Sequence, residues 1–168
     1  MLSKKIEAAL NDQLNKELYS SYLYLSMAAY FEDLNLTGMA QWMRLQADEE
    51  HEHSLKFYDF IIKISGRVIL GQIDKPESMW DSPKAAFEDA LGHEQFITKS
   101  INELTDLAIE EKDHSTNTFL HWFIDEQVEE EANASDIVRK FDLIADSKSG
   151  LYMLDRELGQ RTNTPAAE

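Results

Sequence analysis

Apolar residues recur every three or four positions over most of the chain, and the few glycines and prolines gather in short segments between these stretches. Such spacing places apolar side chains on one face of a helix, and the stretches are rich in helix-forming residues. The pattern predicts five helices, over residues 3–33, 39–64, 83–111, 115–145 and 149–158. The apolar face expected for the first helix contains Ile6, Leu10, Leu14, Leu18 and Leu25.

The second and third helices are separated by the longest connection. Residues 65–82 contain two glycines and one proline and lack helical periodicity, which predicts a long crossover. Gly66 suits the C-terminal cap of the second helix, while Ser82 and Pro83 suit the first positions of the third. The other connections are short turns.

Two long hairpins joined by one crossover are typical of a four-helix bundle. We therefore expect an all-α architecture, that is, a four-helix bundle plus a short C-terminal fifth helix, in a single domain spanning residues 1–168. The polar tail, residues 161–168, should fray.

An internal repeat carries the candidate chemistry. When the sequence is shifted by 77 residues, DEEHEH (48–53) lies over DEQVEE (125–130). The same shift places Glu17 over Glu94. Each of these glutamates lies 33 residues before a residue of the aligned segments, Glu50 or Gln127. The paired positions are Glu17 and Glu94, Glu50 and Gln127, and His53 and Glu130.

The repeated residues should meet at one height in the bundle. Glu17 and His53 lie about equally far from the turn of the first hairpin, and Glu94 and Glu130 about equally far from the turn of the second. In antiparallel hairpins this places all four roughly 27 Å from the turns. Residues three apart share a helical face, so Glu50 and His53 can bind one metal ion while Glu50 spans to a second.

The alternative is that these carboxylates are merely exposed. Glu17, however, is flanked by Leu14 and Leu18 on the apolar side of its helix. Unpaired carboxylates in the interior are costly, whereas two divalent ions would neutralise four of them. Oxygen-rich ligation with one imidazole, from His53, disfavours zinc or copper and suits iron or manganese.

Composition limits the possible partners. The absence of cysteine excludes disulfides, zinc-thiolate sites and iron–sulfur clusters. The net charge of −16 disfavours nucleic acid and anionic membranes as partners, and cations are the natural counterpart. No segment approaches the roughly 20 apolar residues of a membrane span, and the N-terminus has no signal-peptide pattern. We expect a soluble, cytoplasmic protein.

These motifs resemble those of the ferritins, specifically the non-haem bacterial type. The resemblance covers essentially the whole chain and implies iron storage and detoxification in a 24-subunit homo-oligomeric cage, with Fe(II) oxidised by O₂ or H₂O₂ at a di-iron ferroxidase centre. It assigns the first iron to Glu17, Glu50 and His53, and the second to Glu50, Glu94 and Glu130. The catalytic residues it implies are Glu17, Glu50, His53, Glu94, Glu130, Gln127 and Tyr24.

The resemblance also implies a third iron and two aromatic neighbours of the centre. The positions that match the third iron site are Glu49, Glu126, Glu129 and Glu130. Tyr24 and Trp122 would lie beside the di-iron pair and supply an electron. For both aromatic residues, plain core packing is the competing interpretation.

Differences between these motifs and those of related families limit the functions that the chain can have. His51 stands where haem-binding relatives have methionine, so no haem is expected. A di-iron oxygenase or peroxidase without mineral storage is the alternative enzyme. A helical interaction protein with an inert acidic repeat is a third possibility.

Overall fold

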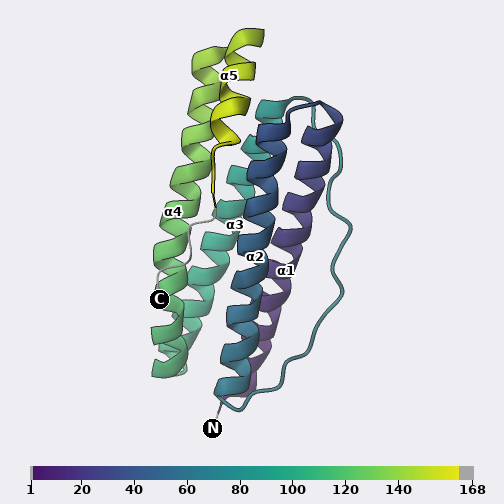
Figure 1. The fold of residues 1–168 in the computed structure, drawn as a ribbon. Coiled ribbons are helices and arrows are strands. Elements are labelled where there is room, and N and C mark those ends of the chain that lie inside the picture. The colour runs from purple at the N-terminus through teal and green to yellow at the C-terminus, as the bar shows by residue number, and fades with distance from the viewer. Residues whose placement is uncertain (1, 163–168) are drawn as a thin grey trace.

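The computed structural model describes residues 2–162, which contain five helices and no strand (Figure 1). The helices are α1 (Lys4–Asp33), α2 (Thr37–Lys63), α3 (Pro83–Glu110), α4 (His114–Ile144) and α5 (Lys148–Leu158). The predicted all-α four-helix bundle with a short fifth helix is confirmed. Every helix begins and ends within two residues of the range expected from the sequence. Of the tail expected to fray, residues 163–168 lie outside the described residues.

The crossover between α2 and α3 runs the length of the bundle along the outer side of α1 (Figure 1). Side chains of α1 hold its backbone in place. Asn11 donates to the carbonyl of Arg67 at 2.9 Å, and Asn15 donates to the carbonyl of Gln72 at 3.0 Å. These hydrogen bonds fix an irregular segment that has no helical bonds of its own.

Four helices begin with a side chain that accepts a backbone N–H of the first turn, as N-caps do. These caps are Ser3, Ser82, Asp113 and Ser147. Helix α2 has no such cap from its own N-cap residue, Leu36. Instead, the Asp155 carboxylate of α5 accepts the Met39 N–H at 2.9 Å, so the fifth helix satisfies the start of the second.

Gly66 takes part in the C-terminal cap of α2, but it is not the left-handed residue of that cap. Ser65 adopts the positive φ of 61°, and the Gly66 N–H donates to the Ile61 carbonyl at 2.8 Å. The cap motif is the expected one, but it lies one residue earlier. A Cβ on Gly66 would lie 2.8 Å from a Leu2 methyl carbon, so glycine here allows close packing.

Buried apolar side chains form two clusters, one towards each end of the bundle. Each of the four long helices contributes side chains to both clusters, and a short segment with buried polar residues separates the two contributions. In α1 this segment lies between Leu14 and Leu23 and contains Glu17. We call the buried polar residues at this height the polar layer: Gln13, Glu17, Gln46, Glu50, His53, Glu94, Gln127 and Glu130.

The predicted apolar face of α1 is correct for three residues and wrong for Leu25, which is 48% exposed. Leu18 is only partly buried. Each directly follows a buried residue, Glu17 or Tyr24, and one helical step rotates a side chain by about 100°. The core face of α1 is therefore centred on the glutamate and the tyrosine.

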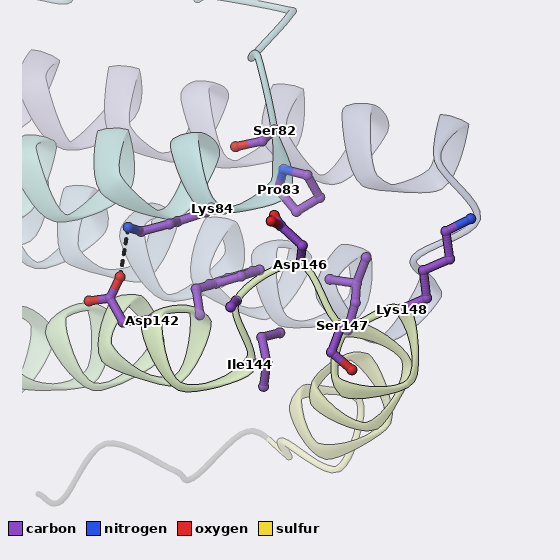
Figure 2. A pocket seen from close by; sticks show the side chains of 11 residues that line it. Ser82, Pro83, Lys84, Asp142, Ile144, Asp146, Ser147 and Lys148 are labelled. Atoms are coloured by element: carbon purple, nitrogen blue, oxygen red, sulfur yellow. Dashed lines mark ion pairs between the residues drawn. The ribbon is translucent and has the colours of Figure 1, made fainter.

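Helix α4 ends at a corner where Ala145 has a φ of 45°. Beside this corner lies a cavity of about 500 Å³, lined by residues at the start of α3 and at the α4–α5 junction (Figure 2). Lys84 and Asp142 form an ion pair across its wall at 2.7 Å.

Helix α5 packs against the start of α2 through two glycines. A Cβ on Gly38 would lie 1.8 Å from the Asp155 carbonyl oxygen, and one on Gly159 would lie 3.1 Å from Gly38 Cα. Only glycine permits this approach of two backbones.

We predict that Gly38→Ala lowers the free energy of unfolding by about 1–3 kcal/mol, because α5 must move away from α2. The measurement is equilibrium denaturation in guanidinium. Gly92→Ala is the matched control, since a Cβ on Gly92 meets no atom within 4 Å and should stabilise α3 by up to about 1 kcal/mol. Equal effects of the two substitutions would refute the proposed packing.

Candidate metal centre

Five potential metal ligands from four helices lie in the polar layer. Helix α1 contributes Glu17, α2 contributes Glu50 and His53, α3 contributes Glu94, and α4 contributes Glu130. None of them is more than 5% exposed. The structure thus brings together the residues that the repeat placed at one height.

Two ligand atoms in this cluster are buried without a hydrogen-bond partner, Glu17 Oε2 and His53 Nδ1. The His53 Nδ1 lies 3.4 Å from Glu50 Oε2. Ligand atoms of Glu17, Glu50 and His53 all lie within 4.8 Å of one another. Leaving buried polar atoms unpaired costs free energy, and a metal ion would satisfy both.

A second group with the same spacing contains His53, Glu126 and Glu130. Glu126 lies one turn before Glu130 and its side chain is 29% exposed. Glu50, Glu94 and Glu130, the trio expected for a second ion, do not form a group this close among the described residues. Glutamine side chains donate hydrogen bonds to Glu94 and Glu130 instead.

Three glutamines orient the carboxylates. Gln13 donates to Glu17 at 2.7 Å. Gln127 donates to Glu94 Oε2 at 3.1 Å. Gln46 donates to two carboxylates, Glu50 at 3.2 Å and Glu130 at 2.8 Å.

Sequence reasoning identified Gln127 from the repeat but missed Gln13 and Gln46. Both lie four residues before a ligand glutamate, Glu17 or Glu50, and therefore one turn away on the same face. That spacing was the available signal.

Burial raises the pKa of these carboxyl groups. At Glu17 burial is the largest cause and the neighbouring Glu50 is the next. Burial also raises the pKa of Glu50 and Glu130 well above the ordinary value, with Glu94 and Glu50 respectively adding to the effect. The pKa of Glu94 is raised for the same reason. The raised pKa values favour the protonated carboxyl groups when no metal is bound, and a divalent cation would compete with those protons.

A family model described as the ferritin-like domain matches residues 7–144. The chain belongs to the ferritin family. Ferritins store iron, and the buried carboxylate and histidine groups are candidate iron ligands.

The relatives agree with this assignment. A bacterial non-heme ferritin from Bacteroides fragilis is 42% identical over 161 residues, which cover 96% of this chain and 100% of the relative. A bacterial non-heme ferritin from Campylobacter jejuni is 40% identical over 93% of each chain. This ferritin is therefore of the non-haem bacterial type.

Solved structures of an archaeal ferritin have the same fold. A closed form of the Archaeoglobus fulgidus ferritin, engineered by site-directed mutagenesis, superposes with a TM-score of 0.96 at 49% identity, covering 98% of this chain and 100% of that one. The open-pore ferritin of the same organism gives a TM-score of 0.95 at 50% identity, covering 96% and 98%. Among residues 2–162 of this ferritin, no helix combines the length and apolar character needed to cross a membrane.

Tyr24 and Trp122 both lie against the candidate metal ligands of this ferritin. Tyr24 is buried and its hydroxyl donates to Glu94. Burial raises the pKa of Tyr24, and the charge of Glu94 raises it further, so the phenol keeps its proton. The Trp122 ring lies edge-on to His53, with centroids 5.3 Å apart.

His93 packs edge-on against the ring of Tyr24. Its Nε2 lies 2.7 Å from Ser20 Oγ, and burial lowers the His93 pKa to about 4. His93 is therefore neutral at pH 7. Sequence reasoning gave no partner for it, because Ser20 lies 73 residues away in the chain.

The residues matched to a third iron site are only partly gathered. Glu126 and Glu130 both approach His53, as described above. Glu49 instead forms an ion pair with Arg161 at 2.5 Å. Glu129 is exposed and belongs to neither ligand group.

We predict that the four buried carboxyl groups make a contribution to the stability of the metal-free protein that falls as pH rises from the ordinary carboxyl value of 4.5 towards 8. The folded state, whose carboxyl pKa values are raised, holds protons that the unfolded state has already lost. Glu17→Gln removes one of these groups without changing its shape. This variant should lose less stability over that range. At pH 8 its free energy of unfolding should exceed that of the wild type by at least about 1 kcal/mol.

Denaturation in guanidinium with a chelator, at pH 5 and pH 8, measures this difference. The exposed Glu52→Gln is the control and should keep the wild-type pH dependence. Identical pH profiles for wild type and Glu17→Gln would refute the inferred cost of burying Glu17.

Proposed function

We propose that this ferritin oxidises Fe(II) at a di-iron centre within each subunit and deposits the ferric product as a mineral inside a 24-subunit cage. The observation that carries the proposal is the polar layer, where buried glutamates and one histidine leave Glu17 Oε2 and His53 Nδ1 without hydrogen bonds. Iron is here the substrate of the reaction.

Glu17, Glu50 and His53 would bind the first Fe(II), and Glu50, Glu94 and Glu130 the second. Glu50 is the bridge, because it neighbours Glu17, His53 and Glu130 in the layer. Binding releases the protons of the carboxylic acids. The glutamine donors hold the freed carboxylates in place by hydrogen bonds.

Two Fe(II) ions supply two electrons. With two protons they reduce O₂ to H₂O₂, or H₂O₂ to two molecules of water, and each iron becomes Fe(III). Holding the two ions together lets both electrons reach one oxidant, so no superoxide is released.

A third Fe(II) at Glu49, Glu126, Glu129 and Glu130 is part of the proposal. The approach of Glu126 and Glu130 to one another supports it. Complete reduction of O₂ to water needs four electrons, which three Fe(II) ions and the Tyr24 phenol would supply. The hydrogen bond from Tyr24 to Glu94 supports a direct route for the fourth electron.

An oxygenase acting on an organic substrate would need room for that substrate beside the metals. The cavity in Figure 2 has no residue of the polar layer in its lining. It therefore gives no support to that alternative.

We predict that Glu50→Ala abolishes the fast phase of Fe(II) oxidation, slowing it at least about tenfold, because both ions lose their shared ligand. Stopped-flow absorbance after mixing with aerobic Fe(II) is the measurement. Glu52→Ala, at an exposed position of the same helix, is the control and should keep the fast phase. Equally fast oxidation by Glu50→Ala would contradict the assignment of the centre.

We also predict that iron added aerobically elutes with a cage-sized particle, in large excess over the number of subunits. Size-exclusion chromatography with iron analysis of each fraction checks both size and iron content. A dimer that retains only two irons per subunit would instead identify a di-iron enzyme. If the protein elutes without bound iron, the remaining interpretation is a helical interaction protein with an inert acidic repeat.

A further inference from the structure

Arg161 lies beside the metal centre although it follows the last helix. Gly159 packs on Gly38, and after it the chain stays beside α2, where Gln41 donates to the Arg161 carbonyl at 3.3 Å. The guanidinium carbon of Arg161 then lies 4.4 Å from the centroid of the Trp42 ring. The Arg161 side chain is 19% exposed.

The guanidinium group makes three hydrogen bonds to α2. Nη1 donates to Gln46 Oε1 at 2.8 Å and to the Trp42 carbonyl at 3.4 Å, and Nη2 donates to Glu49 Oε2 at 2.5 Å. Trp42, Gln46 and Glu49 are spaced by four and three residues and so share one face of α2. A planar guanidinium that stacks on an aromatic ring and donates to two side chains is held in a defined position.

Gln46 connects Arg161 to the polar layer. Its amide oxygen accepts from Arg161, while its amide nitrogen donates to Glu50 and Glu130. Because arginine can only donate, it determines which end of the Gln46 amide faces the carboxylates. Arg161 thereby orients a donor for two expected ligands of the di-iron pair.

Glu49 is the other partner of Arg161 and is among the expected ligands of the third iron. A divalent cation bound to Glu49 would stand in contact with the guanidinium group, and two cations at that distance repel strongly when partly shielded from water. The guanidinium group and the third ion therefore compete for one carboxylate.

We propose that Arg161 is a positioning residue of the metal centre, which holds Gln46 and Glu49 and must be displaced before a third cation binds at Glu49. This inference rests on the proposed function, since it presupposes the di-iron pair and the third site. Its consequence is an order of filling. The pair fills first, and the third site fills only when the ion replaces the arginine.

The test is anaerobic titration of the assembled, full-length protein with Fe(II), followed by calorimetry. In Arg161→Gln the third ion should bind about tenfold more tightly, because no tethered cation competes for Glu49. The affinity of the first two ions should change much less. Arg161→Lys keeps the charge and should keep third-ion binding close to wild type.

Two controls separate competition from a general change in charge. Arg156→Gln removes an exposed positive charge of α5, outside the ion pairs found among the described residues, and should leave all affinities unchanged. In a Glu49→Gln background, Arg161→Gln should have no further effect on the third ion, because the contested carboxylate is gone.

A third-ion affinity in Arg161→Gln within twofold of wild type, with the first two ions bound normally, would overturn this proposal and leave the di-iron centre intact. An equal effect of Arg156→Gln would overturn it as well. A wild-type protein that binds no Fe(II) would overturn the proposed function, and this inference with it.

Discussion

The structure depends on the burial of four glutamates at one height between two apolar clusters. Glu17, Glu50, Glu94 and Glu130 come from four different helices, and burial raises the pKa of each. Burying four ionised carboxylates together is costly, and the raised pKa values show that this layer favours bound protons or, in the loaded protein, divalent cations. The long helices and their register are what bring the four groups to the same point.

The two hairpins share a repeat, but its copies differ where the chemistry is proposed. Glu50 of the first hairpin corresponds to Gln127 of the second, which donates to Glu94. His53 corresponds to Glu130, so the first hairpin has an imidazole where the second has a carboxylate. This asymmetry leaves Glu50 as the single proposed bridging glutamate and makes the two proposed iron positions unequal.

The fold class and the helix ranges could be predicted from the sequence because helical periodicity, caps and turns are local signals. The common height of the glutamates could also be predicted, because residues equally far from the turn of an antiparallel hairpin lie at the same height in the bundle. The left-handed residue of the α2 cap could not be predicted, because Ser65 adopts the conformation that glycine usually takes although Gly66 is the next residue. The exposure of Leu25 was missed because its helix is apolar over a wider arc than the core covers.

The contacts made by Arg161 could not be predicted from the sequence. It reaches Glu49 across 112 residues, and only the packing of α5 on the start of α2 brings the two together. No local pattern encodes such a contact. The same holds for Asp155, which caps α2 from 116 residues away.

The most direct test of the central claim is a crystal structure of the assembled protein loaded anaerobically with Fe(II), with anomalous differences recorded at the iron edge. We predict two iron peaks in the polar layer roughly 3.5–4 Å apart, one beside Glu17 and His53 and the other beside Glu94 and Glu130, with Glu50 between them. Iron peaks found only on the surface, with the polar layer empty, would contradict it.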